Sequence, residues 1–155
     1  MHTVLDRGLI DVQHPRSTVT TSTHHAAAVL RAVRASLTGD STVVATIFAP
    51  NVDATLPTRA TCAAAVAVEF EDRRDAFVDV EVEVVSTETR DTRTWVEWHA
   101  SVTHVGALIV DDTVFPATGR HGVVRGITVA DFVGDRIVGF RQYWDCSGLL
   151  HDAAP

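Results

Sequence analysis

The first half of the chain has apolar residues at helical spacing. Between Ser22 and Gly39 they recur every three or four positions, at Ala26, Val29, Leu30, Val33 and Leu37. This spacing predicts an amphipathic helix that Ser22 or Thr23 caps and Gly39 ends. Residues 40–49 and 58–75 predict two further helices, with a short strand at 51–57 between them.

After Ala76 the apolar period changes from about 3.6 to two. In residues 77–89, four valines (Val78, Val80, Val82 and Val84) alternate with acidic side chains, which predicts a strand with one wet face. Three more strands are expected at 93–110, 123–135 and 136–145. The last two are joined by a hairpin at Gly134–Asp135, and a short helix follows.

Helices followed by antiparallel strands predict an α+β fold. We expect a cone-shaped α+β barrel, in which N-terminal helices pack on a curved, mainly antiparallel sheet and leave a cavity. Residues 1–20 show no period, so we expect a flexible N-terminal arm there. Residues 21–155 should form a single domain, because a chain of this length builds one core.

Alternation along two strands predicts which side chains face the cavity. On 93–110 the more apolar face holds Val96, Trp98, Ala100, Val102 and His104. On 136–145 it holds Val138, Phe140, Gln142 and Trp144. The opposite face carries Trp95, Arg141 and Tyr143, residue types that interfaces favour, so we expect a homodimer through it.

Composition narrows the functional classes. The formal net charge is −7, which argues against nucleic acid as a partner, and every basic residue apart from histidine is Arg. The absence of Lys excludes Schiff-base chemistry and a Walker-type phosphate loop. No apolar run is long enough for a membrane span or a signal peptide, so we expect a cytoplasmic protein with no membrane partner. The rich use of Arg, Ala, Val and Thr is typical of an actinobacterial-type genome.

Metal binding is not expected. Two cysteines, Cys62 and Cys146, make neither a disulfide framework nor a zinc site. The adjacent His24 and His25 would point in different directions on a helix.

The order of elements, with the segments "FAPNVDATLP", "PATGR" and "DFVGDRIVGFRQYWD", resembles the SnoaL-like branch of the nuclear-transport-factor-2-like superfamily. That group includes polyketide cyclases, ketosteroid isomerase and limonene epoxide hydrolase. The resemblance covers about residues 22–152. It implies a conical pocket for a small, apolar or aromatic substrate, no required cofactor, and a homodimer.

The resemblance also bears on the reaction. The epoxide hydrolases use an Asp–Arg–Asp set at positions similar to Trp98, Ala100 and Gln142. None of these is an acid or an Arg, which disfavours epoxide opening by that set. The polyketide cyclases use an Asp with a nearby His. Depending on register, that Asp falls on Gln142 or Asp145.

Two residues are the catalytic candidates. Asp53 lies in the short strand that borders the cavity in this family, where burial would raise its pKa and suit it to general acid–base work. The alternative is a solvent-exposed Asp at a strand end. His104 faces inward and could pair with Asp53 or take a substrate proton. It could also be a rim histidine bonded to the backbone.

Six residues are candidates for substrate binding: Thr55, Trp98, Thr128, Phe140, Gln142 and Trp144. The three rings could equally be core, and Gln142 could simply bond to Thr128 on the neighbouring strand. Asp145 is expected to cap the last helix or pair with Arg141, with a catalytic acid as the alternative.

These observations favour a cofactor-free enzyme of cyclase or isomerase type, acting by acid–base chemistry on an apolar, oxygen-bearing, polyketide-like molecule. A non-catalytic binding or dimerisation module with the same pocket is the alternative. A third possibility is an epoxide-hydrolase-like enzyme with an altered polar set.

Overall fold

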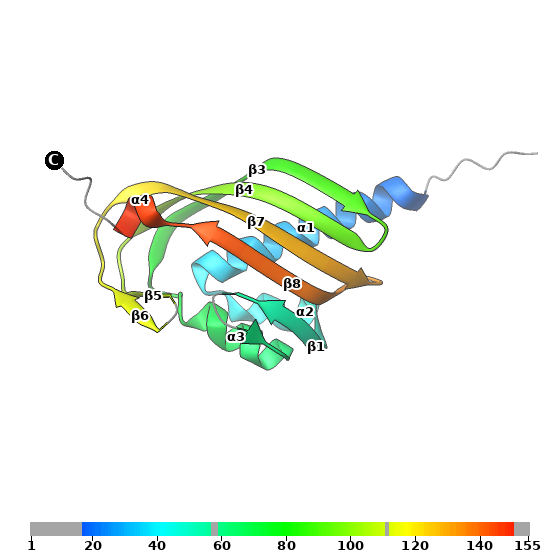
Figure 1. Cartoon of the computed structure of the whole chain (residues 1–155), viewed down its shortest axis with the longest axis horizontal. Helices are drawn as coiled ribbons and strands as arrows, with labels where there is room; N and C mark the ends of the chain where they lie inside the picture. Colours follow the sequence, from blue (N-terminus) through cyan, green and yellow to red (C-terminus); the bar gives the residue numbers. More distant parts are fainter. Residues whose placement is uncertain (1–16, 57–58, 111, 151–155) are drawn as a thin grey trace, which may run out of the picture.

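The protein folds as a curved sheet with helices against one face, as the computed structural model in Figure 1 shows; it describes residues 17–56, 59–110 and 112–150. The helical elements are α1 (Ser17–Thr38), a 3-10 turn at Ser41–Val43, α2 (Val44–Ile47), α3 (Ala63–Glu71) and α4 (Ser147–Leu150). The long strands are β1 (Phe48–Thr55), β3 (Phe77–Arg90), β4 (Arg93–His104), β7 (His121–Val133) and β8 (Arg136–Asp145). Three short strands are β2 (Arg59–Ala60), β5 (Leu108–Val110) and β6 (Thr113–Phe115). The predicted α+β fold is confirmed.

The main sheet has the strand order β2-β1-β8-β7-β4-β3. All its pairs are antiparallel except β1 with β8. The long helix α1 crosses behind β3, β4 and β7, and α2 and α3 lie beside the β1 edge (Figure 1). The sheet therefore curls around α1, and the side chains buried between them form the core.

The helix α1 ends where the sequence predicts. Its last residue is Thr38, and Gly39 follows with a φ of 72°, which glycine adopts without strain. Its start differs from the expectation, since residues 17–20 of the predicted arm already belong to the helix. Residues 1–16 of that arm lie outside the described residues.

The strand β3 departs from simple alternation. Its pairing with β4 shifts between Val78 and Glu81, and Asp79 there has a φ of 54°. This bulge places Phe77 and Val80 inward and leaves Val78 exposed. A second shift follows Val84, which is also exposed. The predicted buried face of all four valines is therefore wrong at both ends.

The predicted strand over 93–110 is broken in two. After His104 the backbone N–H groups of Val105 and Gly106 both donate to the carbonyl of Ala76, at 2.9 and 3.3 Å. A Cβ on Gly106 would lie only 2.0 Å from the carbonyl oxygen of Asp75. The chain can turn away here only because Gly106 lacks a side chain, and it then forms the separate β5–β6 hairpin.

The face assignment of β4 is confirmed. Along this strand buried residues alternate with more exposed ones, and all five residues expected to face inward are buried. They pack against the buried stripe of α1, which comprises Val29, Ala32, Val33, Ser36 and Leu37. None of the described helices is long and apolar enough to cross a membrane.

The close packing of the Trp98 indole against the backbone of Gly126 yields a first prediction. A Cβ on Gly126 would lie 2.3 Å from the Trp98 ring, so Gly126→Ala forces the ring or the strand to move. Overpacking of this kind costs about 1–3 kcal/mol. Urea denaturation should show that loss. Gly148→Ala is the control, because nothing lies within 4 Å of the added methyl. Equal stability of both variants would contradict the packing described here.

Candidate functional site

Asp53 does not face the interior. In β1 the buried residues Val52 and Ala54 flank Asp53, so Asp53 and Thr55 point to the other side of the strand. The Asp53 carboxylate accepts hydrogen bonds from Arg59 Nε and Nη2, both at 3.1 Å, and its side chain is 62% exposed. The expectation that Asp53 lies in the pocket beside His104 is wrong.

The electrostatic surroundings of Asp53 also differ from the expectation. The hydrogen bond from Arg59 lowers the pKa of Asp53 below its ordinary value, where burial was expected to raise it. An exposed carboxylate held ionised by an Arg is poorly suited to accept a proton near neutral pH. The alternative of a solvent-exposed strand residue describes Asp53 as the structure has it. Thr55 is half-buried on the same face.

Two of the predicted binding rings are packed in the core. Trp98 is fully buried over Gly126, and its Nε1–H donates to Thr128 Oγ1 at 3.0 Å. Phe140 is also fully buried and meets Phe48 edge to face, with 5.2 Å between ring centroids. These contacts give Trp98, Thr128 and Phe140 a structural role.

Gln142 is buried with half of its amide unused. Its Nε2 donates to Ser36 Oγ on α1 at 2.9 Å, although Thr128 is its neighbour in the sheet register. Its Oε1 has no hydrogen-bond partner among the described residues. A buried acceptor left without a donor costs free energy, and such groups usually meet a water or a ligand.

Arg73 is a second buried group with an unused donor. It follows the end of α3 and is 2% exposed. Its Nη1 donates to the Ser36 carbonyl at 3.4 Å, whereas Nη2 has no hydrogen-bond partner in the described chain. The Glu69 carboxylate lies 3.8 Å from Nη2, within ion-pair range but beyond a hydrogen bond.

The charge of Arg73 is therefore only partly balanced. Burial lowers the pKa of the Arg73 guanidinium, and the nearby Glu69 and Asp72 carboxylates act in the opposite direction. The ordinary pKa of Arg is so high that the group stays charged. The guanidinium also lies over the ring of Trp144, 5.4 Å from its centroid.

His104 is the third such group. It is fully buried at the end of β4, and its Nδ1 shares a hydrogen bond with Thr118 Oγ1 at 3.1 Å. Thr118 belongs to the "PATGR" segment, which also bonds to the His104 backbone through Gly119 N–H. His104 Nε2 has no partner among the residues described. The imidazole is thus held in place with one nitrogen unused.

Two rings connect these groups. Phe77 lies 5.8 Å from the His104 ring and 6.3 Å from the Trp144 ring, between centroids. Ser36, Arg73, Phe77, His104, Gln142 and Trp144 form one continuous group, which we call the interior polar site. Three of its side chains, Arg73, His104 and Gln142, each have a buried polar atom without a hydrogen-bond partner among the described residues. A fourth such atom, on His25, lies elsewhere, near the β7–β8 hairpin.

The chemistry of the interior polar site rests on one imidazole, one guanidinium and one amide. No Asp or Glu is buried among the described residues, so a buried carboxylate pair is not available there. His104 can accept or donate a proton, and Arg73 and Gln142 offer hydrogen bonds to oxygen atoms. Among the residues that the structure describes, there is no cluster of three or more His, Cys, Asp or Glu residues that could hold a metal.

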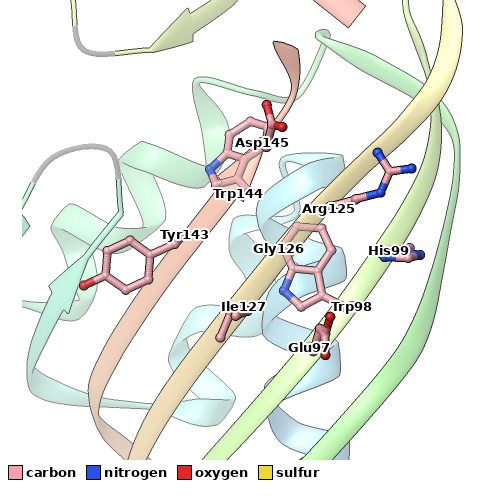
Figure 2. Close-up of a pocket in the computed structure, with 9 residues that line it drawn as sticks. All are labelled: Glu97, Trp98, His99, Arg125, Gly126, Ile127, Tyr143, Trp144 and Asp145. Atoms are coloured by element: carbon pink, nitrogen blue, oxygen red, sulfur yellow. The ribbon is translucent and has the colours of Figure 1, made fainter. Parts of the chain in front are cut away.

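A cleft of about 380 Å³ lies on the outer face of the sheet, where Figure 2 shows its lining residues. Tyr143 borders it on one side, and His99 and Arg125 on the other (Figure 2). Trp144 is half-buried and lines this cleft while also contacting Arg73 and Phe77. Two predicted binding rings, Trp98 and Trp144, therefore belong to residues that line this cleft, and Trp144 also contacts Arg73 and Phe77 of the interior polar site.

Asp145 caps the last helix, as expected. Its Oδ1 accepts a hydrogen bond from Ser147 N–H at 2.8 Å, and this bond lowers the pKa of Asp145. Arg141 is the other expected partner of Asp145, but its Nη2 instead lies 3.5 Å from Asp131 Oδ2. Asp145 is exposed on the outer face, outside the interior polar site.

Sequence reasoning did not identify Ser36, Arg73 or Phe77 as site residues. A signal was present for the first two. Ser36 lies three residues after Val33 on the buried stripe of α1, and Arg73 continues the spacing of Val66 and Phe70. A polar residue at a core position of a helix is informative, because its polar atoms need a partner.

Comparison with known proteins agrees with this architecture. The family model for the SnoaL-like polyketide cyclases matches residues 26–153, so the chain belongs to that family. No curated protein sequence matches the chain. The predicted resemblance is confirmed.

Solved structures show the same fold at low sequence identity. A protein from Jannaschia sp. that is described as a SnoaL-like polyketide cyclase is 15% identical to this chain, with a TM-score of 0.69. The match covers 87% of this chain and 96% of the Jannaschia chain. A SnoaL-like polyketide cyclase from Agrobacterium tumefaciens is 16% identical with a TM-score of 0.61, at 79% and 91% coverage. A protein with a ketosteroid isomerase-like fold from Catenulispora acidiphila, in complex with trimethylamine, is 16% identical with a TM-score of 0.60, at 79% and 88% coverage.

The Trp98–Thr128 hydrogen bond gives a prediction about the core. Thr128→Val keeps the shape but leaves the buried indole N–H without an acceptor, which costs about 1–3 kcal/mol of unfolding free energy. Chemical denaturation of both proteins measures the difference. Thr87→Val, the same change at an exposed strand position, should cost nothing measurable. If the two variants are equally stable, Thr128 has no such structural role.

Proposed function

We propose that this protein is a small enzyme of cyclase or isomerase type, acting by acid–base chemistry on an apolar, oxygen-bearing molecule in the interior polar site. The supporting observation is that three buried side chains there keep hydrogen-bonding atoms without partners. Native interiors seldom tolerate this, and functional sites account for many of the exceptions. Membership of the SnoaL-like polyketide cyclases supports the reaction class.

His104 is the proton-transfer group in this proposal. Its Nδ1 contact with Thr118 fixes the ring, and Nε2 is buried without a partner among the described residues. In its acceptor form Nε2 takes a proton from a carbon next to a substrate carbonyl, and the electron pair moves to the oxygen as an enolate. The imidazolium later returns the proton to carbon or to oxygen of the product. The cycle therefore needs no cofactor.

Arg73 and Gln142 stabilise the substrate oxygens in this scheme. Arg73 Nη2 donates to the enolate, a charge that develops in the transition state and gains most from a fixed donor in a dry interior. Gln142 Oε1 accepts from a substrate hydroxyl, because its Nε2 is committed to Ser36. Trp144 and Phe77 supply flat apolar surface for the carbon skeleton.

A binding module without catalysis is the second candidate. The observation that favours it is the absence of a buried carboxylate among the described residues, which leaves His104 as the one candidate base in the site. The same three unpartnered atoms would then hold a ligand without moving a proton.

Proton abstraction can be tested before the natural substrate is known. We predict that the protein catalyses exchange of deuterium from D₂O into the carbon next to the carbonyl of 2-tetralone, followed by NMR. His104→Asn removes the base and should lower the enzymatic exchange rate about 10²–10⁴-fold. His121→Asn, which changes an exposed histidine, should leave the rate unaltered.

Asp53→Asn distinguishes the interior site from the assignment to Asp53, and we expect full activity. Exchange that Asp53→Asn abolishes and His104→Asn preserves would contradict the proposal. Binding of 2-tetralone without exchange above the buffer rate would favour the binding module.

We also propose that two copies associate through the outer face of the sheet. Val123, Ile127 and Tyr143 expose 41–57% of their surface there, next to the opposite charges of Glu97 and Arg125. A twofold axis would let each Glu97 meet Arg125 of the other copy, while the apolar side chains are covered.

The dimer proposal predicts an assembly of about twice the 16.7 kDa chain mass in light scattering at micromolar concentration. Ile127→Asp places a charge in the contact and should shift the protein to monomer. Val133→Asp introduces the same charge at a 69% exposed position at the end of β7 and should leave the dimer intact. A wild-type protein that is monomeric at every concentration would contradict this assembly.

A further inference from the structure

The buried guanidinium of Arg73 is the strongest unbalanced charge in the interior polar site. It is 2% exposed, and its Nη2 lacks a hydrogen-bond partner in the described chain. Glu69, its ion-pair partner, is partly exposed with 24% of its side chain accessible, and its closest oxygen remains 3.8 Å away. Such an Arg keeps one edge of its rigid fork available for an oxygen anion.

The surroundings of this edge define the rest of the ligand. The Arg73 guanidinium lies over Trp144, and the Phe77 ring meets Trp144 edge to face. These rings offer aromatic surface that suits a flat conjugated ligand, since rings pack on rings in offset or edge-to-face geometry. His104 also contacts the Phe77 ring, and Gln142 is joined to Arg73 through Ser36.

We infer that the interior polar site selects planar, aromatic substrates that carry an anionic oxygen, such as a carboxylate or an acidic enol, and that Arg73 determines this specificity. The inference rests on the proposed function, because it names the substrate class of the same site. Nη2 carries two N–H groups, so one can donate to this anion and the other to the enolate that forms during the reaction. The anion also balances a charge that Glu69 neutralises only in part.

The overall charge of the protein sharpens this inference. A formal net charge of −7 repels anions in general, so non-specific electrostatics disfavours an anionic ligand. A preference for an anion over its neutral counterpart must therefore come from a local site. Trp144 contacts the Arg73 guanidinium and is also one of the residues that line the outer cleft (Figure 2).

Calorimetric titration with three matched probes tests the inference. The probes are 2-naphthoate, 2-hydroxy-1,4-naphthoquinone as an acidic enol, and neutral 2-naphthamide. We expect both anions to bind the wild-type protein at least about tenfold more tightly than the amide, which corresponds to one lost charge-assisted hydrogen bond. Preference for one anion alone identifies carboxylate or enolate as the favoured group.

Substitutions of Arg73 test whether this residue causes the preference for anions. Arg73→Gln keeps a polar side chain without the charge and should abolish the preference for anions, while Arg73→Lys should retain part of it. Arg74→Gln is the control, because Arg74 is the adjacent residue, is 61% exposed and pairs with Glu71. Arg73→Met provides a second variant if Arg73→Gln does not fold. A site built for function rather than stability predicts an unchanged or raised melting temperature for Arg73→Met.

The outcomes separate this inference from the proposed function. Equal affinity of wild type for naphthoate and naphthamide, or a preference lost in Arg74→Gln rather than in Arg73→Gln, overturns the inference. The proposed function survives either result if 2-tetralone exchange still depends on His104. Conversely, an Arg73-dependent preference for anions without any exchange supports the inference and removes the enzymatic proposal.

Discussion

The buried positive charge of Arg73 is the physical constraint on which the proposed interior site depends. Transfer of a guanidinium from water into a protein interior is costly unless partners surround it. Here the Ser36 carbonyl, the Trp144 ring and a distant Glu69 carboxylate supply only part of that compensation. A core of the same size could be built from apolar residues alone. The incompletely paired Arg73 is therefore the observation on which the proposed recognition role of the interior rests.

Much of the fold could be predicted from local signals. Gly39 ends α1 and Gly134 forms the β7–β8 turn, because both adopt positive φ angles that glycine tolerates. The inward face of β4 follows from strict alternation. The bulge at Asp79 and the turn at Gly106 could not be predicted, because each depends on a partner from another element: β4 in the first case and the Ala76 carbonyl in the second.

The site was harder to predict than the fold, for a physical reason. The place of Asp53 in a strand predicts a catalytic role, but successive residues of a strand point to opposite faces. In the structure Asp53 lies on the exposed face of β1, where it pairs with Arg59. His104 and Gln142 were found because alternation fixed their direction. Arg73 follows the end of a helix within a run of charges, where its neighbour Arg74 is exposed, and only the continued spacing from Val66 and Phe70 marks it as buried.

A crystal structure of the protein with 2-naphthoate bound is the most direct test of the interior polar site. We expect ligand density in the interior polar site, with the carboxylate on Arg73 Nη2 and the rings against Trp144 and Phe77. Density confined to the outer cleft, with Arg73, His104 and Gln142 still packed as they are here, would contradict this expectation.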